Sequence, residues 1–115
     1  MRLNFKRIFF LLLIFSIHNC LYAGDLLLGK EKAAIVCAAC HGMDGQAASG
    51  GNSSLTPNIT AQEKEYLLAK LKDYKSCKIN HPQMSLIAQM LSDEDIENVS
   101  EWYSNIKISI ELPLE

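Results

Sequence analysis

Two cysteines and a histidine stand together in one short run, Cys37, Cys40 and His41, in the pattern C-x-x-C-H. If this run is helical, the two sulfur atoms lie about one helical turn apart, so a single group can bond to both. The imidazole directly after the second cysteine adds a nitrogen that binds metals when it is neutral. Three kinds of chemistry use such residues: thiol–disulfide exchange, zinc coordination and the covalent attachment of haem.

The rest of the sequence favours the third kind. A thioredoxin-like dithiol expects a βαβ setting, and no stretch of this chain alternates convincingly as a strand. A zinc site needs four ligands; Cys77 and His81 could supply a second pair, but that spacing is uncommon. A disulfide between Cys37 and Cys40 would be strained and would leave His41 without a role. The motif therefore predicts one haem c, bonded to Cys37 and Cys40, with its iron bound by His41.

The N-terminal segment has the order of a secretory signal peptide. Three of the first seven residues are basic, residues 8–17 are apolar except for one serine, and Ala23 precedes Gly24 as a small cleavage-site residue. The apolar run is about half of the roughly 20 residues that a spanning helix needs. We expect residues 1–23 to be removed on export to the periplasm, which leaves 24–115 as one domain with no membrane span.

Two other fates for this segment remain open. The segment could stay uncleaved as a membrane anchor, although its apolar run is short for a span. Cys20 could carry a lipid, but the residues at 17–19 are not the small ones that lipid attachment prefers. Cleavage near Ala23 would simply discard Cys20.

Charge and cysteine content narrow the function of the predicted mature domain. Three of the 11 Lys and Arg residues lie in the signal segment, so eight remain against 13 Asp and Glu, a net charge of −5. This balance argues against nucleic acid as a partner, because nucleic acid requires a basic surface. Three cysteines remain, which cannot all pair within one chain, so a disulfide framework is a poor explanation of Cys37 and Cys40.

Hydrophobic periodicity and turn residues predict an all-α domain. A loop rich in Gly, Ser and Asn fills residues 41–60. Ser92 reads as the N-cap of the last helix, with three acidic residues in the first turn and Asp95 completing an approximate capping box. Three main helices and one short one are expected, at residues 26–39, 61–76, 84–91 and 93–107. The core that they offer is thin, and a flat apolar cofactor would complete it.

Three stretches together resemble a bacterial class I cytochrome c of the c553 or c4 type. They are CAACHG with Gly29 eight residues ahead of it, the Gly-rich loop that runs to Pro57, and MSLIAQMLSDEDIENVSEWY near the end. The resemblance covers essentially the whole predicted mature chain. It implies the class I fold, in which the helices wrap around one covalent haem. Because the chain has one C-x-x-C-H, two-haem members of this group match it only as half-molecules.

The resemblance implies that a Met sulfur binds iron on the face opposite His41. Met84, which follows Pro82, stands where the family has this ligand. Met43 lies too close to His41 to reach the other face, and Met90 reads as a core residue. His81 reads as a solvent-exposed loop residue, but as a ligand it would give a lower potential than Met84.

Further positions follow from the resemblance. The backbone carbonyl of Pro57 would accept a hydrogen bond from His41, and Gly29 would lie where the first and last helices cross. Ala61 stands in a segment where the family often has Gly, which leaves the form of that turn open. Cys77 is either a buried thiol or an exposed one that links two copies in a dimer.

The function implied is that of a one-electron carrier, not an enzyme, because both axial positions on iron are filled. The family implies transient respiratory partners, such as a terminal oxidase or a quinol-oxidising complex. Other readings are a haem-c subunit of a larger redox enzyme, an open-site haem sensor or enzyme, and, less well supported, a thiol oxidoreductase. The sequence leaves the redox potential, the donor and acceptor, and the oligomeric state unassigned.

Overall fold

A computed structural model describes residues 23–47, 55–109, 111 and 113 of the chain. The predicted signal segment up to residue 22 and part of the Gly-rich loop lie outside the described residues. Within the described ranges the regular structure is helical, and there is no strand. The helices are α2 (Leu26–Val36), α3 (Ala38–His41), α4 (Lys64–Lys75), α5 (Met84–Gln89) and α6 (Asp93–Ser104). The all-α prediction is confirmed.

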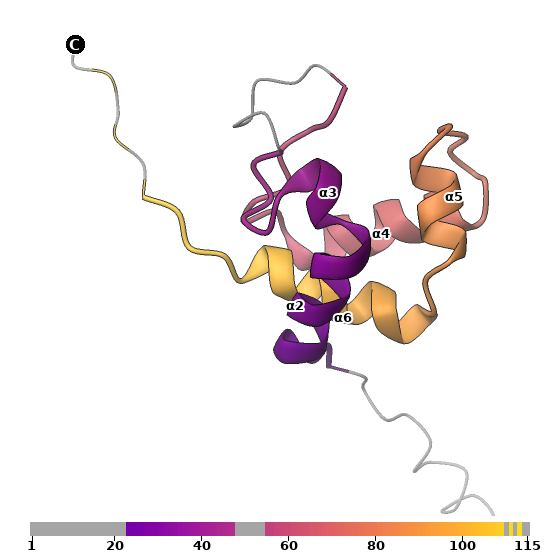
Figure 1. Cartoon of the computed structure of the whole chain (residues 1–115), viewed down its shortest axis with the longest axis horizontal. Coiled ribbons are helices and arrows are strands. Elements are labelled where there is room, and N and C mark those ends of the chain that lie inside the picture. The colour runs from indigo at the N-terminus through magenta and orange to yellow at the C-terminus, as the bar shows by residue number, and fades with distance from the viewer. Residues whose placement is uncertain (1–22, 48–54, 110, 112, 114–115) are drawn as a thin grey trace, which may run out of the picture.

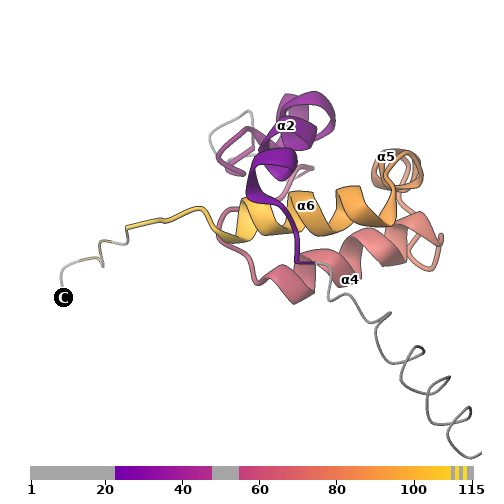
Figure 2. The same ribbon diagram turned by 90° about the horizontal axis from the view of Figure 1, so that it is seen from below.

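The first and last long helices cross at Gly29. Figures 1 and 2 show α2 lying across α6, with α4 along the other side of α6. A Cβ on Gly29 would fall 2.0 Å from the backbone oxygen of Asn98 and 3.2 Å from Cβ of Trp102. Asp25 fixes the start of α2: its side chain accepts from the N–H groups of Leu27 and Leu28, and its own N–H donates to the Asn98 side chain. Close backbone approach at Gly29 therefore sets the crossing of α2 and α6.

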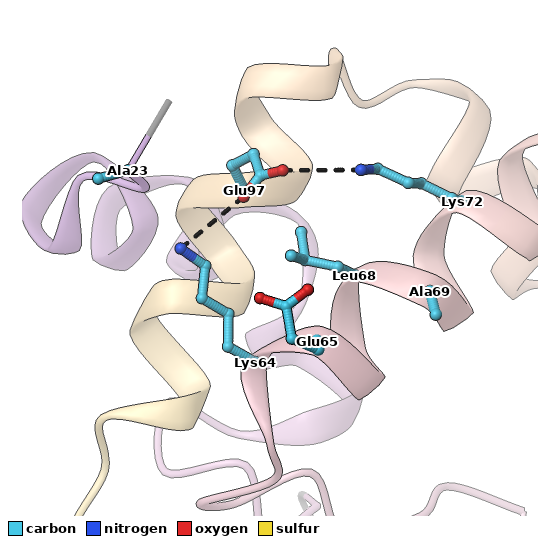
Figure 3. A pocket seen from close by; sticks show the side chains of 7 residues that line it. All are labelled: Ala23, Lys64, Glu65, Leu68, Ala69, Lys72 and Glu97. Carbon is cyan, nitrogen blue, oxygen red and sulfur yellow. Dashed lines mark ion pairs between the residues drawn. The ribbon is translucent and has the colours of Figure 1, made fainter. Parts of the chain in front are cut away.

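Ion pairs join α4 to α6. Ser92 and Asp95 form the predicted capping box at the start of α6. The ammonium group of Lys64 lies 2.8 Å from Glu101 and 3.8 Å from Glu97, and Lys72 lies 3.6 Å from Glu97. Figure 3 shows Lys64 and Lys72 on either side of Glu97. Lys64 and Lys72 of α4 thus face the acidic side of α6.

Several boundaries differ from the predicted ones for local reasons. The first helix is broken at Cys37, which separates α2 from α3. The second begins at Lys64 instead of residue 61, because Ala61 has a φ of +53° and gives its N–H to the Tyr103 carbonyl. Helix α6 ends at Ser104, three residues before the predicted end at residue 107.

The buried core is small and lies in two clusters. One joins Ala33, Leu67 and Tyr103, and the other joins Leu68, Leu91 and Ile96. Trp102 and Ile106 are partly buried against the first cluster, whereas Ile96, Val99 and Tyr103 are the fully buried apolar residues of α6. Such a core stabilises a domain of this size only modestly.

Candidate functional site

The C-x-x-C-H run forms a tight turn between two helices. Cys37 is the junction residue, and α3 supplies Cys40 and His41 from a single turn closed by His41 N–H donating to the Cys37 carbonyl at 2.9 Å. Both cysteines are free thiols; Cys37 is partly buried and Cys40 is exposed. The geometry therefore presents two unpaired sulfur atoms, about one turn apart, beside a histidine.

One ring nitrogen of His41 is held by the protein. Nδ1 lies 3.2 Å from the carbonyl oxygen of Pro57, and because a carbonyl only accepts, Nδ1 carries the proton. Within the described part of the chain, Nε2 has no hydrogen-bond partner. Burial lowers the pKa of His41, and the hydrogen bond to Pro57 partly opposes this effect. A neutral ring with Nε2 unprotonated has the form that binds a metal.

The segment after His41 is anchored by the end of α6. The Tyr103 hydroxyl donates to the Gly42 carbonyl at 2.9 Å, and the Trp102 indole N–H donates to the Met43 carbonyl at 3.1 Å. Gly42 has a φ of +74°, which suits a residue without Cβ. Neither Trp102 nor Tyr103 was predicted from the sequence to hold this segment. Their polar ends were the available signal, because buried Tyr and Trp usually find a hydrogen-bond partner.

The turn before Met84 is organised by His81. Its ring Nδ1 accepts from the backbone N–H groups of Met84 at 3.2 Å and of Gln83 at 3.3 Å. The backbone N–H of His81 donates to the Ser85 hydroxyl. The ring also packs edge-on against Tyr74, with centroids 5.9 Å apart. The expectation of a solvent-exposed loop histidine was wrong: His81 is half-buried and fixes the start of α5. Met84 is the first residue of α5 and is also half-buried.

Two other sequence expectations also fail. Met90, which follows the last residue of α5, is exposed instead of packing in the core, because Leu91 takes the buried position beside it. Cys77 is exposed, so the buried-thiol alternative is wrong. It lies in the turn after α4 with a φ of +57°, and Gln89 donates to its sulfur at 3.3 Å.

The donor set fits haem c better than it fits the rival chemistries. Burial raises the pKa of Cys37 to about 11, whereas a reactive dithiol needs a lowered thiol pKa. Among the described residues, no three His, Cys, Asp or Glu side chains gather as a metal site. The small divided core also leaves apolar side chains uncovered, Leu55 and Leu86 among them. Two free sulfurs, a neutral imidazole and unfilled apolar surface suit a flat apolar group bonded at Cys37 and Cys40.

A separate groove of about 620 Å³ runs between α4 and α6 (Figure 3). Its lining includes Lys64, Leu68, Lys72 and Glu97, together with Ala23 at its edge. None of the predicted haem-site residues lines it. In the described part of the chain, no helix has the length and apolarity required to cross a bilayer.

Comparison with known proteins finds one matching family model and several related proteins. The family model described as cytochrome c matches residues 27–107. Cytochrome c-554(548) from Halomonas halodenitrificans is 40% identical over 86 residues, which cover 72% of this chain and 98% of that protein. Cytochrome c4 from Pseudomonas aeruginosa is 34% identical over 88 residues, covering 76% of this chain and 41% of that protein.

A solved structure gives the same result for the fold. The crystal structure of reduced recombinant cytochrome c4 from Pseudomonas stutzeri matches with a TM-score of 0.65 and 31% identity, covering 76% of this chain and 48% of that chain. The chain therefore spans nearly the whole of cytochrome c-554(548) but less than half of the cytochrome c4 proteins.

Two further relatives have names that mention redox enzymes. One is a thiosulfate dehydrogenase electron acceptor from Stutzerimonas stutzeri, 36% identical over 63% of this chain and 32% of that protein. The other is a cytochrome subunit of sulfide dehydrogenase from Chlorobaculum tepidum, 30% identical over 66% of this chain and 64% of that protein.

Proposed function

This chain belongs to the cytochrome c family, whose members are electron carriers with covalently bound haem c, and from that premise we propose that it serves a periplasmic respiratory chain with its iron held between His41 and Met84. Bound haem c supplies an iron that alternates between two oxidation states. Cys37 and Cys40 would hold the group through thioether bonds. The proposal includes removal of residues 1–23, which leaves 24–115 as the carrier.

The hydrogen bond from His41 to Pro57 is the observation that best supports this proposal. It fixes the ring orientation, keeps the proton on Nδ1 and leaves Nε2 as the donor atom for iron. Trp102 and Tyr103 hold the backbone that follows, so the ring is attached to the rigid end of α6. A ring held in one orientation would need no rearrangement between the two oxidation states of the iron, which suits one-electron transfer.

Met84 is the proposed second ligand. His81 and the hydroxyl of Ser85 order the turn that carries it, through the backbone contacts described above. Since His81 Nδ1 is already engaged as an acceptor of two backbone N–H groups, the same nitrogen is not free to bind iron. With His41 and Met84 both holding the iron, no position would remain for a substrate at the metal, and the protein would act as a carrier instead of a haem enzyme or sensor.

The partners proposed are redox proteins that it meets transiently, a terminal oxidase or a quinol-oxidising complex. A second candidate role is that of an electron-accepting partner or subunit of a dehydrogenase. The relatives named for thiosulfate and sulfide dehydrogenases favour this second role. Both roles need the same site and differ only in the protein that delivers or receives the electron.

A potentiometric titration of the mature holoprotein tests this function. We expect one reversible one-electron transition, and a Met84→His variant should titrate at a clearly lower potential, because Met ligation raises the potential of c-type haem. A Met43→Leu variant serves as a control and should leave the potential unchanged. A wild-type protein that binds exogenous ligands in the reduced state without denaturation would instead indicate an open iron site.

A further inference from the structure

The two residues that follow the proposed cleavage point are fixed on the surface of α6. A Cβ on Gly24 would fall 2.6 Å from the backbone oxygen of Glu97 and 2.8 Å from Cβ of Glu101, so a larger residue would have to displace the α6 backbone. The N–H of Asp25 donates at 2.6 Å to the side chain of Asn98, which is buried. Close contact at one residue and a hydrogen bond to a buried side chain at the next therefore hold the start of the predicted mature domain in one place.

The nitrogen of Gly24 changes its chemistry when the signal segment is removed. In the uncleaved chain it is a neutral amide nitrogen, and its N–H has no hydrogen-bond partner among the described residues. Hydrolysis of the peptide bond between Ala23 and Gly24 adds the OH of water to the Ala23 carbonyl carbon and the remaining H to the Gly24 nitrogen. The new carboxyl group releases a proton and the new amine takes one up, because an α-amino group has an ordinary pKa of about 8. The product is an ammonium group with three donors where one unpaired N–H stood.

Helices α4 and α6 bring one more negative than positive charge to this place. The groups are the ammonium groups of Lys64 and Lys72 and the carboxylates of Glu65, Glu97 and Glu101. Four of these residues line the groove at whose edge Ala23 lies (Figure 3). Glu97 has only two long lysine contacts, at 3.6 and 3.8 Å, because Lys64 lies closer to Glu101. The side chains of Glu97 and Glu101 are only 21% and 26% exposed, so a charge beside them is screened less than on the open surface. One further cation would balance this cluster.

We propose that the amino terminus freed on Gly24 binds beside Glu97 and Glu101 and completes the ion pairs between α4 and α6. This inference rests on the cleavage that is part of the proposed function, and it gives the product of that cleavage a structural role. The carboxylate of Asp25 does not compete for the amine, because it accepts from two N–H groups at the start of α2. A terminus one residue earlier would place the charge about 3.8 Å further along the chain. The surface of α6 is therefore matched to cleavage directly after Ala23.

Trace acetylation of the mature holoprotein at a series of pH values tests this proposal. Only the unprotonated amine reacts, so the midpoint of the pH profile measures its proton affinity, whereas the height of the profile measures its accessibility. Mass spectrometry of the N-terminal peptide follows the reaction. We expect the amine of Gly24 to hold its proton at least about threefold more tightly in the folded protein than in denaturant, because two neighbouring carboxylates favour the ammonium form. The same midpoint in both states would overturn the proposal.

Matched variants assign the carboxylates. Glu97→Gln should weaken the proton affinity of the amine at least about twofold. Glu31→Gln makes the same charge change on the exposed side of α2, at a residue without an ion pair to another described residue, and should leave the affinity within about 1.5-fold of wild type. Equal effects of both variants would contradict the assignment. Gly24→Ala keeps the amine but displaces it from α6, so an unchanged midpoint in this variant would also overturn the proposal.

The mass of the intact mature protein and its absorption spectrum keep this inference separate from the carrier function. A mature protein that begins at a residue other than Gly24 would overturn the proposed binding of the amino terminus, while a spectrum of covalent haem would leave the carrier function intact. A protein that begins at Gly24 and shows the expected shift in its pH profile would support the inference whatever the axial ligands of the iron.

Discussion

At the scale of single residues, His41 gives one ring nitrogen to the protein and keeps the other available for the iron of the proposed site. The Nδ1–H group donates a hydrogen bond to the Pro57 carbonyl, and burial lowers the pKa of the ring, so the neutral form is favoured. The motif predicted the residue types of this site, since C-x-x-C-H specifies three of them by spacing alone. The role of His81 was not predictable in the same way, because a loop histidine before a proline has no sequence signal for its acceptor geometry.

His81 should act as a positioning residue for Met84. Replacing it with Ala removes the acceptor for the N–H groups of Gln83 and Met84, at a cost of about 0.5–2 kcal/mol in stability, as for loss of a helix cap. The sulfur-to-iron absorption of the oxidised protein should weaken as well. His81→Asn, whose side-chain oxygen can occupy the place of Nδ1, should restore both properties. If His81→Ala left the sulfur band at full strength, His81 would have only a structural role.

Ala61 is a site where a glycine should stabilise the fold. Its φ of +53° costs an L-residue about 1–2 kcal/mol, of which the greater freedom of glycine in the unfolded chain cancels about 0.5–1 kcal/mol. Ala61→Gly should therefore raise the free energy of unfolding by about 0.5–1 kcal/mol in chemical denaturation. Ala69→Gly, on the exposed side of α4, should lower it by about 1 kcal/mol and serves as the control.

At the scale of helices, contacts across the chain decided the boundaries that the sequence left uncertain. The capping box at Ser92 is local, and it was predictable from residue types. The start of α4 was not, because the N–H of Ala61 is taken by the Tyr103 carbonyl, 42 positions along the chain. Helical propensity cannot anticipate a hydrogen bond that forms only when α6 is in place. The exposure of Met90 similarly depends on which side of α5 faces α4.

The crossing of α2 and α6 should not tolerate a larger residue at Gly29. Helix propensity alone predicts that Gly29→Ala stabilises α2 by about 1 kcal/mol. The clash with the Asn98 backbone oxygen should reverse this and cost about 1–3 kcal/mol, because backbone cannot move aside cheaply. Thermal unfolding of the holoprotein shows whether Gly29→Ala raises or lowers the stability. Ala34→Gly, on the exposed side of α2, measures the effect of helix propensity alone, because this position does not lie at the crossing with α6.

The ion pair between α4 and α6 should make stability depend on pH in a defined window. A hydrogen bond from Lys64 lowers the pKa of Glu101 below 4.5, and the same bond raises the pKa of Lys64 above 10.5. The lowered carboxyl pKa adds stability above pH 4.5 that is lost as the pH falls through the folded-state pKa. The raised ammonium pKa adds stability below pH 10.5 that is lost as the pH rises through the folded-state pKa.

A Glu101→Gln variant measures this contribution. Between pH 4.5 and 10.5 it should be less stable than wild type by about 0.5–1 kcal/mol, and the difference should shrink as the pH falls below 4.5 and Glu101 becomes protonated, first in the unfolded and then in the folded state. Denaturation series at pH 7 and near pH 3 supply the comparison. A difference that stays constant across this range would show that the pair contributes nothing through charge.

At the scale of the whole molecule, we expect the covalently bound haem to form part of the hydrophobic core. The buried apolar residues form only two small clusters, and a domain of this size often needs a covalent or metal staple. This need was visible in the sequence as a thin set of helices around a long loop. What the sequence did not show is the pairing of α4 lysines with acidic residues of α6, which becomes evident only when the helices are packed.

A variant that cannot attach haem should therefore lose much of its folded structure. A Cys37→Ala, Cys40→Ala double variant is expected to show reduced helical circular dichroism and to lose the cooperative thermal transition of the holoprotein. A Cys77→Ala variant removes an exposed thiol and should change neither property. A double variant that unfolded cooperatively at the wild-type temperature would show that the protein core suffices alone.

The absorption spectrum of the mature protein, oxidised and reduced, tests the central claim most directly. After expression with a c-type maturation system, we predict sharp reduced bands that survive acid–acetone extraction and a weak sulfur-to-iron band in the oxidised form, lost in Met84→Ala. Covalent haem without that band in the wild type would contradict ligation by Met84. Absence of covalent haem despite competent maturation would contradict the account as a whole.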